Sequence, residues 1–157
     1  MTARLSRASH VVLDTDATSW LLDPRPLPRA ERARALVGTR ARVVSFVTVT
    51  ELRFGALRAG WGELRLRRLE RSLGDLDVIQ TNDTLIARCA ALRDQAGRTG
   101  HPLMQKVHEA DRWVATTALV LDLELVAGDR IFEGVSGLTL RRVPPPSSSR
   151  CSCSPYG

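Results

Sequence analysis

The chain has 157 residues, which is enough for one domain of ordinary size with a buried core. Hydrophobic residues make up 43% and charged residues 25%, a composition that excludes a largely disordered chain. The formal net charge is +6, and because Lys106 is the only lysine, nearly all of the positive charge is arginine. Arginine binds phosphate through paired hydrogen bonds, so this positive charge is compatible with a polyanionic partner such as a nucleic acid. It is equally compatible with a charged surface that only keeps the protein soluble.

The cysteines and the N-terminus indicate a reducing compartment. Cys89, Cys151 and Cys153 are an odd set with two members near the C-terminus, which excludes a disulfide framework and gives only a weak metal signal. The opening MTARLSRASH lacks the apolar stretch of a signal peptide, and no apolar run approaches the ~18–20 residues that span a bilayer. We therefore expect a cytoplasmic protein without a membrane partner.

Short apolar runs alternate with helical stretches along residues 9–143. We expect strands at 10–14, 42–46, 76–80 and 123–128, with an edge strand at 138–143. We expect helices after Thr18 and over about 28–37, 47–59, 61–73, 82–96 (ending at Gly97) and 107–122. This alternation predicts an α/β domain with a mostly parallel sheet of four to five strands and helices on both faces. The Pro/Ser-rich tail, residues 144–157, has little to bury and is expected to be disordered.

Four acidic residues stand where such a sheet would bring them together. Asp14 ends the first strand, Asp129 follows the fourth, and Glu51 and Asp111 are expected in the first turns of two helices. Taken singly, each could cap a helix, favour the positive end of a helix or pair with an arginine. In open α/β sheets, however, ligands bind beyond the carboxyl ends of the strands, so we expect all four at one edge.

Clustered carboxylates repel one another unless a cation compensates them. Carboxylate oxygens suit Mg²⁺ or Mn²⁺, and such ions can activate water against a phosphodiester. Asp111 also shares an apolar helix face with Val107, Val114, Ala115 and Ala118, which raises the question of what neutralises its charge.

The first stretch also allows a phosphatase. Asp14, Asp16 and Thr18 match the D-x-D-x-T pattern of haloacid dehalogenase-like phosphatases, where the first Asp is the nucleophile and the second a general acid/base. The remaining motifs could be filled by Ser45, Lys106, Gly128, Asp129 and Glu133. This alternative gives Glu51 and Asp111 no role, and it needs a strand-end hydroxyl, whereas Ser45 lies inside an apolar run. The motif is short and arises by chance.

Three longer segments resemble the PIN-domain ribonucleases in order and spacing: VVLDTDATSWLL, SFVTVTELRFGALRAG and HEADRWVATTALVLDLELVAGDRIFEGVSGLTL. Among these ribonucleases the chain looks most like the VapC toxins of bacterial VapB–VapC toxin–antitoxin pairs. The resemblance covers about positions 10–142. Its most specific parts are the T-x-x-E-L-x-x-G stretch from Thr48 to Gly55 and the stretch from Ala110 to Leu119.

The resemblance implies a three-layer α/β/α PIN-like domain over 9–143 and an endoribonuclease that hydrolyses RNA through metal-activated water. It implies that Asp14, Glu51, Asp111 and Asp129 bind Mg²⁺ or Mn²⁺, while Asp16 becomes a helix cap or a neighbour of the site. It also implies a homodimer and a VapB-type antitoxin whose C-terminal segment occupies the acidic groove. A further alternative is a PIN-like module that binds RNA or a partner without cleaving.

Two positions depart from the family pattern. Ala127 stands where Thr or Ser often precedes the fourth acid by two residues, and Ile131 stands where another acid is common. Both departures affect only the surroundings of Asp129.

Other residues have structural explanations that we favour. His108 could act as a general base, but a capping or surface histidine is expected because metal-activated water needs no histidine. Tryptophan side chains can stack on nucleic-acid bases, but we expect the three tryptophans of this chain in the core or at interfaces: Trp20, Trp61 and Trp113. The arginines of the fourth helix could touch RNA and are expected on a solvated face or a dimer rim: Arg65, Arg67, Arg68 and Arg71.

Overall fold

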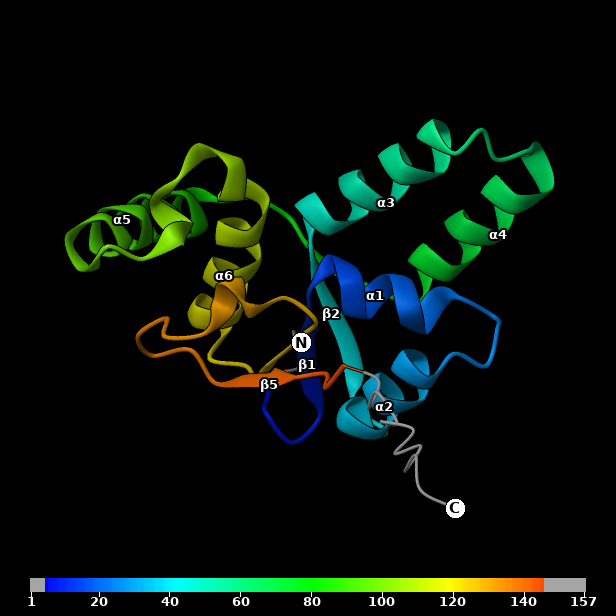
Figure 1. The fold of residues 1–157 in the computed structure, drawn as a ribbon, viewed down its shortest axis with the longest axis horizontal. Coiled ribbons are helices and arrows are strands. Elements are labelled where there is room, and N and C mark those ends of the chain that lie inside the picture. The colour runs from blue at the N-terminus through cyan, green and yellow to red at the C-terminus, as the bar shows by residue number, and fades with distance from the viewer. Residues whose placement is uncertain (1–4, 146–157) are drawn as a thin grey trace, which may run out of the picture.

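The computed structural model of the chain describes residues 5–145, so the predicted disordered tail falls almost wholly outside the described residues (Figure 1). Strands and helices alternate in chain order: β1 (His10–Leu13), α1 (Thr15–Leu22), α2 (Pro28–Val37), β2 (Ala41–Ser45), α3 (Phe46–Arg58), α4 (Glu63–Gly74), β3 (Asp77–Ile79), α5 (Asp83–Thr99), α6 (Glu109–Leu121), β4 (Leu125–Ala127) and β5 (Leu140–Arg142). Short 3₁₀ helices lie between them: η1 (Pro102–Met104), η2 (Lys106–His108) and η3 (Arg130–Phe132). Within this part of the chain, no helix is both long and apolar enough to cross a membrane.

The five strands form one parallel sheet in the order β3-β2-β1-β4-β5. The register places Leu13 of the central β1 between Val44 of β2 and Val126 of β4. Because all the strands run in the same direction, the carboxyl ends of β1, β2 and β4 meet at one edge of the sheet. The residues that follow these strands are therefore brought together there.

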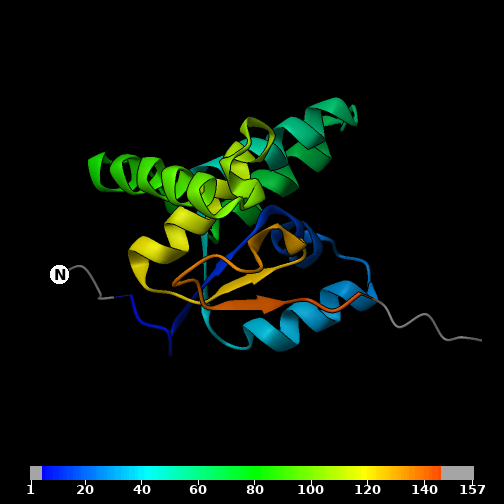
Figure 2. The ribbon, with the colours of Figure 1, turned by 60° about the vertical axis from the view of Figure 1, so that its left-hand side comes forward.

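Helices cover both faces of the sheet, which confirms the predicted three-layer α/β/α fold (Figure 2). Alternation along β1 separates the two cores, because successive side chains point to opposite faces. Val11 and Leu13 pack with buried residues of α1, α2, α3 and α4, whereas Val12 packs with those of α5 and α6. The strands therefore carry near-continuous apolar runs, as expected for a parallel sheet that is buried on both faces.

Three local expectations were wrong. The first helix begins at Thr15 rather than after Thr18, because Asp14 itself caps it and accepts a hydrogen bond from the Ala17 N–H at 2.7 Å. The fifth helix runs through Gly97 and ends at Gly100, whose φ of 70° is the left-handed conformation that favours glycine. Val107 is 78% exposed, because η2 interrupts the α-helical spacing before Asp111.

Candidate active site

Asp14 is the central acid of this edge. It follows β1 directly and is only 4% exposed. Its Oδ1 accepts a hydrogen bond from the Ala17 N–H at 2.7 Å, and its Oδ2 accepts one from the Gly128 N–H at 2.9 Å. Burial nevertheless raises the pKa of Asp14 to about 7, because desolvation outweighs the backbone donors that favour its charged form. Asp14 thus joins the start of α1 to the loop after β4.

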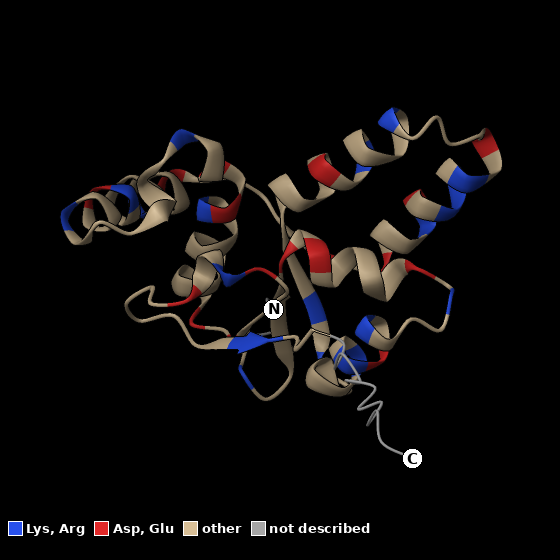
Figure 3. Ribbon diagram, viewed as in Figure 1, with Lys and Arg blue, Asp and Glu red and all other residues tan. Residues whose placement is uncertain are grey.

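Three further acids lie within electrostatic reach of one another: Asp16, Asp111 and Asp129. Burial raises the pKa of Asp16, and the charge of Asp129 raises it further. Burial also raises the pKa of Asp111, with added contributions from Asp129 and Asp16, while His108 opposes the rise. Figure 3 shows acidic segments at the start of α1, at the start of α6 and in the loop after β4. The parallel sheet thus gathers acids from three separate segments.

Asp129 and Asp16 have different local roles in the backbone structure. Asp129 caps η3, accepting a hydrogen bond from the Ile131 N–H at 3.0 Å, which is one of the structural roles considered for it. Asp16 is not a helix cap, because Asp14 fills that position and Asp16 stands one residue inside α1. Asp16 instead lies near Asp129 and Asp111, which agrees with the other expectation for it, a neighbour of the site.

Glu51 reaches the same edge from α3. It is the sixth residue of that helix and so lies in the second turn rather than the first. Its Oε2 accepts a hydrogen bond from the hydroxyl of Thr15, the residue next to Asp14. This contact places Glu51 beside the end of β1, although Glu51 itself is exposed.

Among residues 5–145, the five carboxylates of this edge form no ion pair with arginine or lysine, although the charge of Arg29 acts on Asp16 and opposes the rise of its pKa. Of these five carboxylates, only Asp111 contacts a histidine, His108, at 3.0 Å. The donor set therefore fits a divalent cation such as Mg²⁺ or Mn²⁺, which carboxylate oxygens bind. In the described part of the chain, however, no three Asp, Glu, His or Cys side chains already stand close enough together to hold an ion. Binding would require these side chains to converge.

Trp20 packs against the acidic edge. A Cβ placed on Gly128 would stand 2.4 Å from Cη2 of Trp20 and 3.2 Å from the Cβ of Asp16, so only glycine fits at that position. The Arg29 guanidinium lies 5.6 Å from the centroid of the Trp20 ring. Trp113 packs edge-on against Phe46 at 5.4 Å between centroids, so both tryptophans pack against neighbouring groups, as expected.

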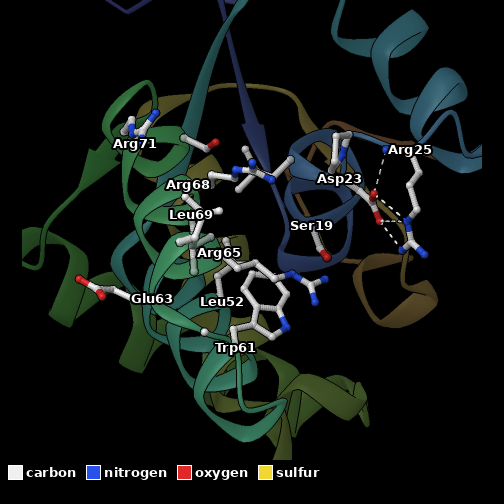
Figure 4. A pocket seen from close by; sticks show the side chains of 15 residues that line it. Ser19, Asp23, Arg25, Leu52, Trp61, Glu63, Arg65, Arg68, Leu69 and Arg71 are labelled. Carbon is white, nitrogen blue, oxygen red and sulfur yellow. Dashed lines mark hydrogen bonds and ion pairs between the residues drawn. The ribbon is translucent and has the colours of Figure 1, made fainter.

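A cleft of about 1120 Å³ adjoins the acidic edge, between α1 and α4 (Figure 4). Its apolar wall includes Leu52, the neighbour of Glu51, and Trp61, over which the Arg65 guanidinium lies at 3.8 Å. Its opposite side includes Ser19, one turn after Thr15 on α1. The basic residues that line it are Arg25, Arg65, Arg68 and Arg71.

The arginines of α4 therefore divide into two groups. Arg67 is solvated and paired with Glu63, as expected for the whole cluster. Arg65, Arg68 and Arg71 are exposed as well, and they also line the cleft, which the sequence pattern did not predict.

The family model of the PIN domain matches residues 11–138. The chain belongs to the PIN domain family. Among named relatives, Ribonuclease VapC1 of Haemophilus influenzae (strain R2866) is 28% identical over 115 residues, which cover 73% of this chain and 83% of that protein. Ribonuclease VapC5 of Mycobacterium tuberculosis (strain ATCC 25618 / H37Rv) is 27% identical over 131 residues, which cover 80% and 93%.

Solved structures of toxin–antitoxin complexes share the fold of this PIN domain. VapBC-1 from nontypeable Haemophilus influenzae matches with a TM-score of 0.66 at 26% identity, covering 85% of this chain and 97% of that one. VapBC2 from Rickettsia felis, bound to a DNA fragment from its promoter, matches with a TM-score of 0.70 at 18% identity, covering 86% and 99%. At that identity the second match shows the fold alone.

The family match does not favour the phosphatase alternative, although one argument against that alternative was wrong. Ser45 is the last residue of β2, so it does stand at a strand end. It is fully buried, and its Oγ has no hydrogen-bond partner among the described residues. The choice between the two classes therefore rests on the PIN match over residues 11–138.

Proposed function

We propose that this PIN domain is a divalent-metal-dependent endoribonuclease and the toxin of a type II toxin–antitoxin pair. One observation carries the proposal: carboxylates without arginine or lysine partners gather at the carboxyl edge of the sheet, in a chain related to proteins named Ribonuclease VapC1 and VapC5. The net charge of +6 suits the RNA backbone that such an enzyme would hold.

The proposed roles are those that the resemblance to the PIN-domain ribonucleases implies, and the location of the acids at one edge of the sheet supports them. Asp14 and Asp111 hold the principal Mg²⁺ or Mn²⁺, Glu51 completes or bridges the site, and Asp129 assists or binds a second ion. The bound ion would supply Lewis acidity, lowering the pKa of water and stabilising the leaving oxygen of the phosphodiester. Two backbone N–H groups hold Asp14 in place, and the Thr15 hydroxyl holds Glu51 beside it.

The partner we propose is a VapB-type antitoxin with an amphipathic, acidic segment in the cleft beside α4. The apolar wall at Leu52 and Trp61 would take its apolar side chains, and Arg68 and Arg71 would pair with its acids. Because Ser19 of the cleft lies one turn from Thr15, whose hydroxyl contacts Glu51, a segment lying in the cleft can continue onto the acidic edge. A related structure from Mycobacterium tuberculosis is described as a member of the VapBC family of toxin–antitoxin systems, which supports this kind of partner.

We also propose that the toxin is a homodimer. Apolar side chains remain exposed at the start of α5, where Ile86 is 51% exposed, and in the connection to α6, where Met104 is 43% and Val107 78% exposed; Ile86 and Met104 line the same surface pocket. Exposed apolar groups that gather in one region are typical of surfaces that bury against another chain. Sedimentation of the purified protein would test this assignment, and a monomer at all concentrations would contradict it.

Cleavage of total RNA with end mapping tests the enzymatic proposal. The purified chain should cut RNA in Mn²⁺ or Mg²⁺ and stop in EDTA, and Asp111→Asn should remove cleavage without unfolding the protein. Asp75→Asn is the matched control, because Asp75 follows α4 at the opposite end of the sheet and should cut like the parent. An Asp111→Asn variant that cuts RNA at the parent rate would refute the assignment.

The same preparation separates the alternatives. Hydrolysis of a small phosphate ester through a covalent intermediate on Asp14 would support the phosphatase. RNA binding without cleavage in Mn²⁺ would support a catalytically silent module.

A further inference from the structure

His108 contacts one of the acids directly. Its Nδ1 lies 3.0 Å from Oδ2 of Asp111, and the two side chains are 29% and 33% exposed. His108 occupies the position that precedes α6, where a polar side chain commonly accepts a hydrogen bond from the helix backbone, but its side chain makes no such bond. His108 thus occupies the capping position that the sequence favoured, but its side chain contacts Asp111 and not the helix backbone.

The donor in this contact can be assigned from chemistry. A carboxylate that binds a metal is ionised and only accepts hydrogen bonds, so in the metal-binding form of Asp111 the proton between the two groups belongs to Nδ1 of His108. A single N–H directed at one oxygen leaves the other oxygen, Oδ1, free. Carboxylates that bind metals commonly carry such a hydrogen bond from a neighbouring group, which fixes their orientation.

The backbone around His108 is held from the inside of the protein. Arg112 is 3% exposed, and its Nη1 donates hydrogen bonds to the carbonyl oxygens of Leu103 and Gln105. These contacts tie the segment that leads into η2 to the first turn of α6. His108 ends η2, and Asp111 lies in that first turn, so both side chains are placed by one rigid unit.

Asp111 needs such a restraint because its acidic neighbours oppose it. Asp129 and Asp16 both disfavour the charged form of Asp111, whereas the contact with His108 favours it. The contact with Nδ1 of His108 is the only side-chain hydrogen bond that Asp111 makes among the described residues. His108 is the group that counters this repulsion before any cation is bound.

We infer that His108 is a positioning residue that holds Oδ2 of Asp111 through its Nδ1–H and thereby presents the other carboxylate oxygen to the divalent cation. The inference rests on the proposed function, because it assumes that Asp111 binds a metal. It assigns to His108 neither contact with RNA nor transfer of a proton.

Two amide isosteres distinguish the two ring nitrogens. In His108→Asn the amide nitrogen stands close to the place of Nδ1, whereas in His108→Gln it stands close to the place of Nε2. We would measure Mn²⁺ binding to the full chain by titration calorimetry for the parent, His108→Ala, His108→Asn and His108→Gln. Urea denaturation without metal would confirm that each variant is folded.

The expected result is a loss of Mn²⁺ affinity of roughly 10- to 100-fold in His108→Ala and His108→Gln, with substantial recovery in His108→Asn. In an Asp111→Asn background, His108→Ala should change Mn²⁺ affinity no further, because the pair acts as a unit. If His108 had a merely structural role, all three His108 variants would lose Mn²⁺ affinity to the same extent, and the losses from His108→Ala and Asp111→Asn would add in the double variant. Either result would overturn the inference.

Failure of the inference and failure of the proposed function give different results. A parent protein that binds Mn²⁺ and cleaves RNA, with His108→Ala binding Mn²⁺ equally well, refutes the role of His108 alone. A parent protein that binds no Mn²⁺ and cleaves no RNA refutes the metal-dependent function and the inference with it.

Discussion

Gly128 donates its backbone N–H to Oδ2 of Asp14 across 2.9 Å, joining the loop after β4 to the end of β1. The contact connects two adjacent parallel strands at the edge where the acids gather. It also depends on close packing, because Trp20 fills the space where a side chain on residue 128 would stand. The hydrogen bond that holds the buried Asp14 therefore depends on glycine at position 128.

Gly128→Ala should destabilise the domain and displace Trp20. The new methyl group would stand 2.4 Å from Cη2 of the indole, and such overpacking costs about 1–3 kcal/mol. Urea denaturation followed by tryptophan fluorescence measures both effects. Gly55→Ala is the control, because nothing lies within 4 Å of its added methyl group and alanine favours a helix. Equal stability of Gly128→Ala and the parent would contradict the close approach.

The metal-free protein should lose stability as pH rises, in part through Asp14. Its pKa is about 7 in the folded chain against an ordinary 3.8, so between these values the folded state binds more protons than the unfolded state. The stabilisation is complete below the unfolded pKa and is lost as pH rises through the folded pKa. A rise of this size corresponds to about 4 kcal/mol.

Asp14→Asn cannot ionise, so its free energy of unfolding should fall less than that of the parent between about pH 4 and pH 8. Urea denaturation in EDTA across this range measures the difference, and comparison with the parent cancels the contributions of Asp16 and Asp111. Asp75→Asn should follow the parent. Parallel stability curves for Asp14→Asn and the parent would show that Asp14 is not held in the raised-pKa state.

Thr15→Val should weaken metal-supported cleavage while leaving the domain folded. The substitution removes the hydroxyl that donates to Oε2 of Glu51, and loss of such a supporting contact typically costs roughly 10-fold or more in activity or metal affinity. Thr15→Ser keeps the hydroxyl and should retain most of the activity. The comparison uses initial cleavage rates across a Mn²⁺ titration. Equal rates in the Val and Ser variants would deny Thr15 a role in holding Glu51.

Reversing the charge of the cleft should separate partner binding from catalysis. The double change Arg68→Glu with Arg71→Glu places acids against an acidic antitoxin segment, and like charges at an interface suppress association. We expect at least a ~10-fold loss of antitoxin affinity by calorimetry, with RNA cleavage by the free toxin retained. Arg88→Glu on α5, outside the cleft, should bind the antitoxin like the parent. Unchanged binding by the double variant would place the antitoxin elsewhere.

The local sequence pattern predicted the order of the strands and helices correctly, and it predicted which strand end or helix each acid lies on. The strand beginning at His10 and the helix over 28–37 follow from apolar runs and a proline at the helix start, which act over a few residues. Errors arose where a local signal competed with packing. The sequence pattern predicts a helix end at Gly97, but α5 continues past it. Ala96 is still buried in the core, and Gly100 has the left-handed backbone conformation that ends the helix.

The sequence by itself determined that the chain alternates strands and helices, and that Asp14 and Asp129 follow parallel strands, because alternation and burial are set by near neighbours. Only the tertiary structure decided which acids influence one another, that Asp16 joins them, and that Nδ1 of His108 meets Asp111. It also decided which of the exposed arginines of α4 line a cleft. Side-chain orientation depends on groups that are distant in sequence and close in space, and no local pattern records those distances.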